Sequence, residues 1–135
     1  MKVQERSKFV RLALFSNGIV DLISAVLLFF PVFTIPLAGY TSYTNQFAFV
    51  TGGWGIAAFS FGIGRIWASY RPEYYWIMVI LGLIEGSILT LFCLINIFFL
   101  DISLMQAGMP LTVGSVFGVL YLISVISLMR NVKHG

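Results

Sequence analysis

Four long apolar segments constrain this chain more than any other feature of its sequence. They cover about residues 9–33, 46–69, 74–100 and 111–129. A helix needs roughly 20 apolar residues to cross about 30 Å of hydrocarbon, and transmembrane β-strands would instead show alternating stretches of about ten residues. The runs are continuous, so we predict an all-α membrane protein. Residues 1–135 would form a single integral membrane domain, a four-transmembrane-helix bundle.

Composition argues against the soluble alternatives. Hydrophobic residues make up 59% of the 135 residues and charged residues only 10%, whereas a soluble domain carries about 25% charged residues. A soluble domain of this size lacks the interior to bury so much apolar surface. The first partner that we expect is therefore the lipid bilayer, and we expect no nucleic acid despite the formal net charge of +3.

The basic residues predict the orientation of the helices. All eight lie at the first segment, around the turn after the second segment or after the fourth: Lys2, Arg6, Lys8, Arg11, Arg65, Arg71, Arg130 and Lys133. The two opposite loops, 34–45 and 101–110, contain none. By the positive-inside rule both termini and the middle turn are expected in the cytoplasm, with the protein in the inner membrane of a bacterial or archaeal cell.

Aromatic residues and prolines mark the ends of the expected helices. The aromatic residues of the middle turn are typical of an interfacial belt and comprise Trp67, Tyr70, Tyr74, Tyr75 and Trp76. Pro31 and Pro36 are expected to close the first helix, because proline lacks the N–H that a helix interior requires. Pro72 is expected in the turn before the third helix, and Pro110 is expected to open the fourth.

The chain has few residues that could hold a cofactor or perform covalent chemistry. Cys93 is the single cysteine, and His134 is the single histidine. Haem, di-iron and zinc sites need larger ligand sets, so we expect no cofactor and no metal. A nucleophile–base pair is also missing from the sequence pattern, which favours a protein that is not an enzyme.

An internal similarity predicts a tandem repeat of a two-helix hairpin. Gly18–Asp21 (GIVD) resembles Gly82–Glu85 (GLIE), 64 residues later. A shift of 65 pairs Gly53 with Gly118 and Arg65 with Arg130. Glycine and aliphatic residues are common in membrane helices, so a chance match remains the alternative to a true repeat.

Two carboxyl groups define a candidate intramembrane polar site. Asp21 and Glu85 are expected about 15–18 Å from the cytoplasmic surface, where a charge costs roughly 2.5–3.5 kcal/mol. Asn17 lies one turn from Asp21, and Arg65 either extends outward to the cytoplasmic surface or turns inward to Asp21 or Asn17. Without a cation at their own depth, at least one carboxyl should be protonated.

The same carboxyl groups admit two roles. They could form an exchangeable proton or cation site, or they could be neutral acids that join helices through hydrogen bonds worth about 0.6–2 kcal/mol each. Glycines mark expected helix contacts, namely Gly82 with Gly86, Gly114 with Gly118, and Gly53 in the second helix. Such faces could pack within the bundle or against another copy or subunit.

The layout resembles the small bacterial four-helix membrane proteins called BphX-like or DoxX-like. The resemblance rests on the basic N-terminus, the stretch from Gly18 to Pro31, the glycine-rich second helix that ends with Arg65, and the glycine and acid of the third helix, Gly82 to Gly86. It implies an accessory subunit of a membrane complex, with no catalytic residue to carry over.

These observations lead to one functional expectation and one alternative. We expect a non-enzymatic four-helix membrane protein that acts as an accessory or assembly subunit, or as a self-associating bundle. The alternative is a small proton- or cation-linked transporter or channel that uses its mid-membrane carboxyls.

Overall fold

The chain folds into four long helices joined by short connections. The structure, a computed structural model, describes residues 3–37, 39–40 and 44–132; Lys2, Lys133 and His134 lie outside these residues. Its elements are α1 (Val3–Phe29), α2 (Pro31–Leu37), α3 (Asn45–Ser69), the 3₁₀ helix η1 (Pro72–Tyr74), α4 (Tyr75–Phe99) and α5 (Leu104–Val132). Four segments are long and apolar enough to span a bilayer: Ser7–Phe29, Asn45–Ser69, Pro72–Phe99 and Leu104–Arg130. The all-α, four-helix prediction is confirmed.

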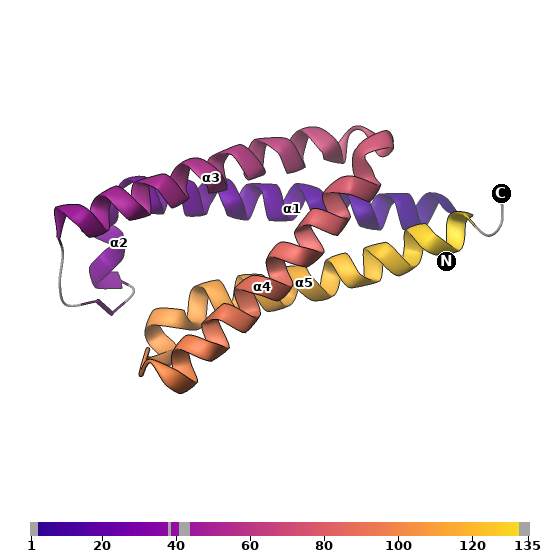
Figure 1. Cartoon of the computed structure of the whole chain (residues 1–135). Coiled ribbons are helices and arrows are strands. Elements are labelled where there is room, and N and C mark those ends of the chain that lie inside the picture. The colour runs from indigo at the N-terminus through magenta and orange to yellow at the C-terminus, as the bar shows by residue number, and fades with distance from the viewer. Residues whose placement is uncertain (1–2, 38, 41–43, 133–135) are drawn as a thin grey trace.

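The helices pack as two antiparallel hairpins. Helix α1 packs along α3, and α4 packs along α5. The second hairpin crosses the first at an angle, and the start of α1 and the end of α5 lie at the same end of the bundle (Figure 1). Each helix therefore packs mainly against its neighbour in the sequence, as the predicted hairpin organisation requires.

The first helix ends as its prolines predict, although the following segment is more helical than expected. Helix α1 stops at Phe29, and Pro31 starts the short helix α2, where its missing N–H costs nothing. Pro36, expected together with Pro31 to close the first helix, lies inside α2. Gly39 follows with φ of 77°, a left-handed conformation that glycine adopts without strain.

The start of the fourth helix corrects a prediction. Helix α5 begins at Leu104, so Pro110 lies within it and does not open it. The reason is a capping box that precedes the proline: Ser103 Oγ accepts from Gln106 N at 3.3 Å, and Gln106 Oε1 accepts from Ser103 N at 3.0 Å. Pro110 removes the backbone hydrogen bond that its own N–H would have made, and its ring crowds the carbonyl of Gln106, yet the helix continues through it.

The apolar core lies where the two hairpins meet. Its buried members are Val10 and Leu14 of α1, Tyr75 and Val79 of α4, and Tyr121 of α5. Close to the same end of the bundle, the aromatic residues of the α3–α4 turn contact one another, with the rings of Trp67 and Tyr74 4.6 Å apart. The core therefore joins the hairpins on the side of the chain termini, next to the polar residues described below.

Candidate functional site

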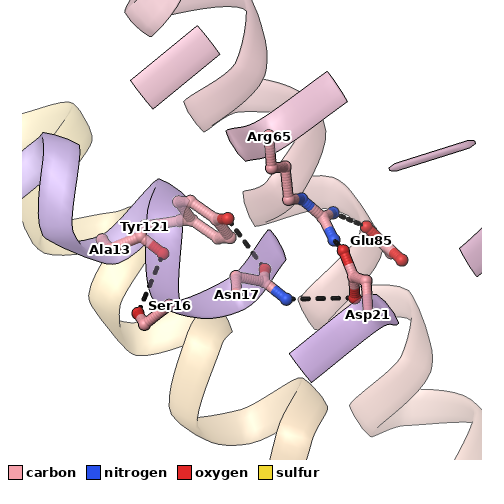
Figure 2. Close-up of polar contacts among 7 residues, drawn as sticks. All are labelled: Ala13, Ser16, Asn17, Asp21, Arg65, Glu85 and Tyr121. Carbon is pink, nitrogen blue, oxygen red and sulfur yellow. Dashed lines mark hydrogen bonds and ion pairs between the residues drawn. The ribbon is translucent and has the colours of Figure 1, made fainter. Parts of the chain in front are cut away.

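Arg65 is the centre of a buried ion cluster between the two hairpins. From α3, its Nη1 pairs with Asp21 Oδ2 of α1, and its Nη2 pairs with Glu85 Oε2 of α4. Figure 2 shows the guanidinium pointing at both carboxyl groups. Asp21 and Glu85, which come from different hairpins, therefore meet at one cation near the middle of their candidate spans.

Two neutral side chains extend the cluster to the fourth long helix. Asn17 Nδ2, on α1, donates to Asp21 Oδ1 at 3.2 Å. Tyr121 Oη, on α5, donates to Asn17 Oδ1 at 2.8 Å (Figure 2). A continuous polar chain thus runs from Tyr121 through Asn17, Asp21 and Arg65 to Glu85, and it includes one or more residues from each of the four long helices.

The three charged side chains differ in their exposure. The side chain of Arg65 is 2% exposed and that of Asp21 is 12% exposed, whereas that of Glu85 is 44% exposed. Leu81, Ile84 and Ile88 are exposed on the same face of α4, at helical spacing around Glu85. The cluster is therefore closed at Asp21 and open at Glu85, on a face that is otherwise apolar.

The inward position of Arg65 decides between the two alternatives left open by the sequence. Its side chain does not extend toward the end of the bundle but lies between α1 and α4, with its guanidinium carbon 5.4 Å from the centre of the Phe61 ring. Arg65 Nε has no hydrogen-bond partner among the described residues. The expectation of a protonated carboxyl assumed that no cation lay at this depth, and that assumption is wrong. Formally, one guanidinium faces two carboxyls, which leaves an excess of one negative charge when both are ionised.

Close helix approach explains why Arg65 can reach Asp21. Gly18 and Gly62 lie where α1 crosses α3, and a Cβ added to Gly18 would come within 2.9 Å of the Gly62 carbonyl oxygen. The two backbones are therefore close enough for a side chain near the end of α3 to reach the middle of α1. Small residues at such crossings are typical of membrane helices.

The structure brings all four predicted site residues together, namely Asn17, Asp21, Arg65 and Glu85, and adds one that the sequence did not single out. Tyr121 was overlooked because it lies in an apolar helix without a nearby charge. Its distance from both ends of the span Leu104–Arg130 was the available signal, since tyrosines of membrane helices are enriched at the interfaces. A buried hydroxyl at mid-span usually has a hydrogen-bond partner.

The predicted packing glycines fall into two groups. Gly82 faces the ring of Tyr121, and Gly86 faces Gly114 and Gly118 so closely that an added Cβ would lie 2.8 Å from the Gly114 carbonyl oxygen. These four glycines therefore hold α4 against α5. Gly53 does not pack within the chain, because nothing described lies within 4 Å of an added Cβ there.

The contacts also correct the residue pairs assigned to the predicted repeat. Gly118 contacts Gly86, whereas its assigned counterpart Gly53 is open. Gly18 faces Gly62 and Ile66, and its counterpart Gly82 faces Tyr121. The residue of the second helix that faces the glycine before the acid is therefore Tyr121 in the second hairpin and Ile66, next to Arg65, in the first. The hairpin organisation agrees with a repeat, but the second helices of the two hairpins are shifted relative to the sequence match.

The cluster is made of one cation, two acids, an amide and a phenol. The described residues contain no group of three or more His, Cys, Asp or Glu side chains that could hold a metal ion. The chain matches no family model, no curated protein and no solved structure. The resemblance to the BphX-like and DoxX-like proteins stays a prediction, and function is argued below from the geometry of the cluster.

Proposed function

We propose that this chain is a non-enzymatic membrane subunit that acts by associating with other membrane-embedded helices, either a second copy or a larger complex. Arg65 and Asp21 supply the rigid part of this design, because their buried ion pair ties α1 to α3. Glu85 adds α4, and the bond between Tyr121 and Asn17 adds α5. A fixed bundle of this kind suits a packing role.

The exposure of Glu85 is the observation that supports association. A carboxyl that is 44% exposed lies near the middle of a candidate span, among exposed Leu81, Ile84 and Ile88. Such a group is costly next to lipid tails, and intramembrane acids usually face protein or water. A helix that covers this face of α4 would remove the cost, so we place the association surface there.

Site-directed cross-linking in native membranes tests this surface. In a Cys93→Ser background, Ile84→Cys on the exposed face should form a cross-linked product with a second copy or with another membrane protein. Val79→Cys on the same helix is the matched control, because Val79 is fully buried. A chain that stays strictly monomeric in mild detergent, with no cross-link at position 84 and no co-purifying protein, would contradict the proposal.

A second candidate function is supported by the charge of the cluster. Two carboxyls share one guanidinium, and the more exposed of them, Glu85, is placed to exchange a proton or a small cation. A small proton- or cation-linked transporter would use this exchange.

Flux measurements separate this candidate from the first. Proteoliposomes that contain the chain should show pH-dependent uptake of a cation or solute, and Glu85→Gln should abolish it. Glu73→Gln is the control, since Glu73 lies in the α3–α4 turn and pairs with Arg71 at 3.7 Å. Uptake that is flat across a broad panel of ions and solutes would rule out the transporter.

A further inference from the structure

A second polar site lies apart from the Arg65 cluster, at the end of the bundle where α1 starts and α5 ends. There a cavity of about 240 Å³ opens between the start of α1 and the turn that joins α3 to α4. Ser7, Lys8 and Arg11 of α1 line one side, and Ser69, Tyr70 and Tyr75 line the other. None of the five residues of the ion cluster lines this cavity.

The charge of the cavity selects an anion. Lys8 and Arg11 are one helical turn apart on α1, so both cations face the same opening. The guanidinium carbon of Arg11 lies 4.7 Å from the centre of the Tyr70 ring, and this stacking holds the cation at the edge of the cavity. None of the described lining residues is acidic.

Some polar groups of the cavity are already hydrogen-bonded within the protein, and others remain to bind a ligand. Tyr75 Oη donates to the Ser69 carbonyl oxygen at 2.9 Å, and Ser69 Oγ donates to the Ile66 carbonyl oxygen at 2.6 Å. These hydroxyls have already used their hydrogens, so they fix the shape of the wall between α3 and α4. The charged groups that remain to bind an anion are the Lys8 ammonium and the Arg11 guanidinium.

The position of the cavity indicates where the anion comes from. Two candidate spans, Ser7–Phe29 and Pro72–Phe99, begin at its lining residues. The rings of Trp67, near the end of α3, and Tyr74, just before α4, contact each other, as aromatic residues do at the level of lipid headgroups. These are the positions expected at the level of the lipid headgroups, where the phosphate groups of a bilayer lie.

We propose that this cavity binds the phosphate group of an anionic glycerophospholipid, with Lys8 and Arg11 pairing with the phosphate. The volume supports a headgroup as the occupant, because pockets for drug-sized ligands measure about 300–1,000 Å³ and this one is smaller. The acyl chains would remain in the bilayer beside the bundle.

Lipid retention by the purified full chain tests the proposal. Native mass spectrometry from micelles that contain equal amounts of phosphatidylglycerol and phosphatidylcholine should show preferential retention of phosphatidylglycerol. Lys8→Gln and Arg11→Gln should each weaken this retention about fivefold. Arg130→Gln is the matched control, because Arg130 is an exposed cation at the same end of the bundle and outside the cavity, and it should leave retention unchanged. Equal losses in all three variants would show diffuse attraction and overturn the proposal.

Two further measurements test whether the retained lipid occupies the cavity itself and whether the ligand is a lipid. Ser7→Phe fills the cavity without changing the charge, and it should reduce phosphatidylglycerol retention to the level of phosphatidylcholine while the unfolding temperature stays close to that of the parent chain. Full retention in Ser7→Phe would overturn the proposal. Inorganic phosphate at millimolar concentration should not displace the lipid, and complete displacement would assign the site to a soluble phosphate and overturn the lipid assignment.

Discussion

Tyr121 of α5 donates a hydrogen bond of 2.8 Å to Asn17 of α1, and this bond connects the two hairpins. It also fixes the amide of Asn17, because the oxygen accepts from Tyr121 while the nitrogen donates to Asp21. The position of a carboxyl in the first hairpin thus depends on a phenol in the second. The polar groups form one network, so a change at one residue should be felt at the others.

Tyr121→Phe should weaken the association of the hairpins without unfolding the helices. The variant keeps the ring against Gly82 but leaves the Asn17 oxygen without its donor. Hydrogen bonds between membrane helices contribute about 0.6–1.7 kcal/mol, and we expect a loss in this range in detergent-mediated unfolding. Tyr74→Phe, at an exposed tyrosine of the turn, is the control. An unfolding free energy equal to that of the parent chain would show that the bond contributes nothing.

Arg65→Met should destabilise the bundle strongly. Removal of one partner from a buried ion pair leaves the other charge uncompensated and costs about 3–5 kcal/mol. The substitution Arg130→Met, at an exposed arginine, should cost far less. Combining Arg65→Met with Asp21→Asn and Glu85→Gln should recover part of the loss, because no uncompensated charge remains. Thermal unfolding in micelles measures all of these variants, and a triple variant no more stable than Arg65→Met would contradict the explanation.

The two carboxyls should be individually replaceable but not jointly. Asp21→Asn or Glu85→Gln leaves one carboxylate with Arg65, whereas the double variant leaves a lone buried cation. Asp21→Asn should cost more than Glu85→Gln, because Asp21 is more buried and also accepts from Asn17. In a double-mutant cycle we expect a coupling energy on the order of 0.5–3 kcal/mol. Strictly additive losses would show that the two acids do not share the guanidinium.

Gly86→Ala should separate α4 from α5, whereas Gly53→Ala should be harmless. The added methyl group at Gly86 would meet the backbone of Gly114 and Gly118 at 2.8–2.9 Å, and backbone atoms cannot move aside as a flexible side chain can. Overpacking of this kind costs about 1–3 kcal/mol. At Gly53 nothing described lies within 4 Å, so the unfolding temperature should remain unchanged or rise slightly. A larger loss of stability in Gly53→Ala than in Gly86→Ala would show that Gly53, and not Gly86, lies at a close helix contact.

Both chain termini should lie in the cytoplasm. The basic residues with described side chains, except the buried Arg65, lie at the end of the bundle formed by the start of α1, the α3–α4 turn and the end of α5. A green fluorescent protein fused to the C-terminus should therefore fluoresce, and alkaline phosphatase fused after Ile102 should be active outside the cytoplasm. The reverse result from both reporters would show that the bundle has the opposite orientation in the membrane.

Local signals determined most of the helices. The apolar runs located the ends of the spans within a few residues, except at the start of the fourth, because the length and continuity of such runs reflect the thickness of the bilayer. Pro31 ended the first helix as expected. Pro110 does not mark the start of α5, because the capping box of Ser103 and Gln106, a motif that the sequence contains, starts the helix before the proline.

The polar site was only partly accessible from the sequence. The cost of charge in a membrane pointed to Asp21 and Glu85, and helical spacing added Asn17. The direction of the Arg65 side chain could not be read, because a long side chain near the end of a helix can reach the surface or the interior. The contribution of Tyr121 depends on a contact between residues 104 positions apart.

The sequence by itself determined that this protein is a bundle of four membrane helices and that two of them carry acids at comparable depth, because both properties follow from the cost of placing polar groups in hydrocarbon. The tertiary structure decided which cation the acids share, which glycines are in contact, and which residues of the second helix face the first helix in each hairpin. These depend on how closely α1 approaches α3 and α4 approaches α5, and helix packing of this kind is set by side-chain shapes on surfaces that meet only after folding.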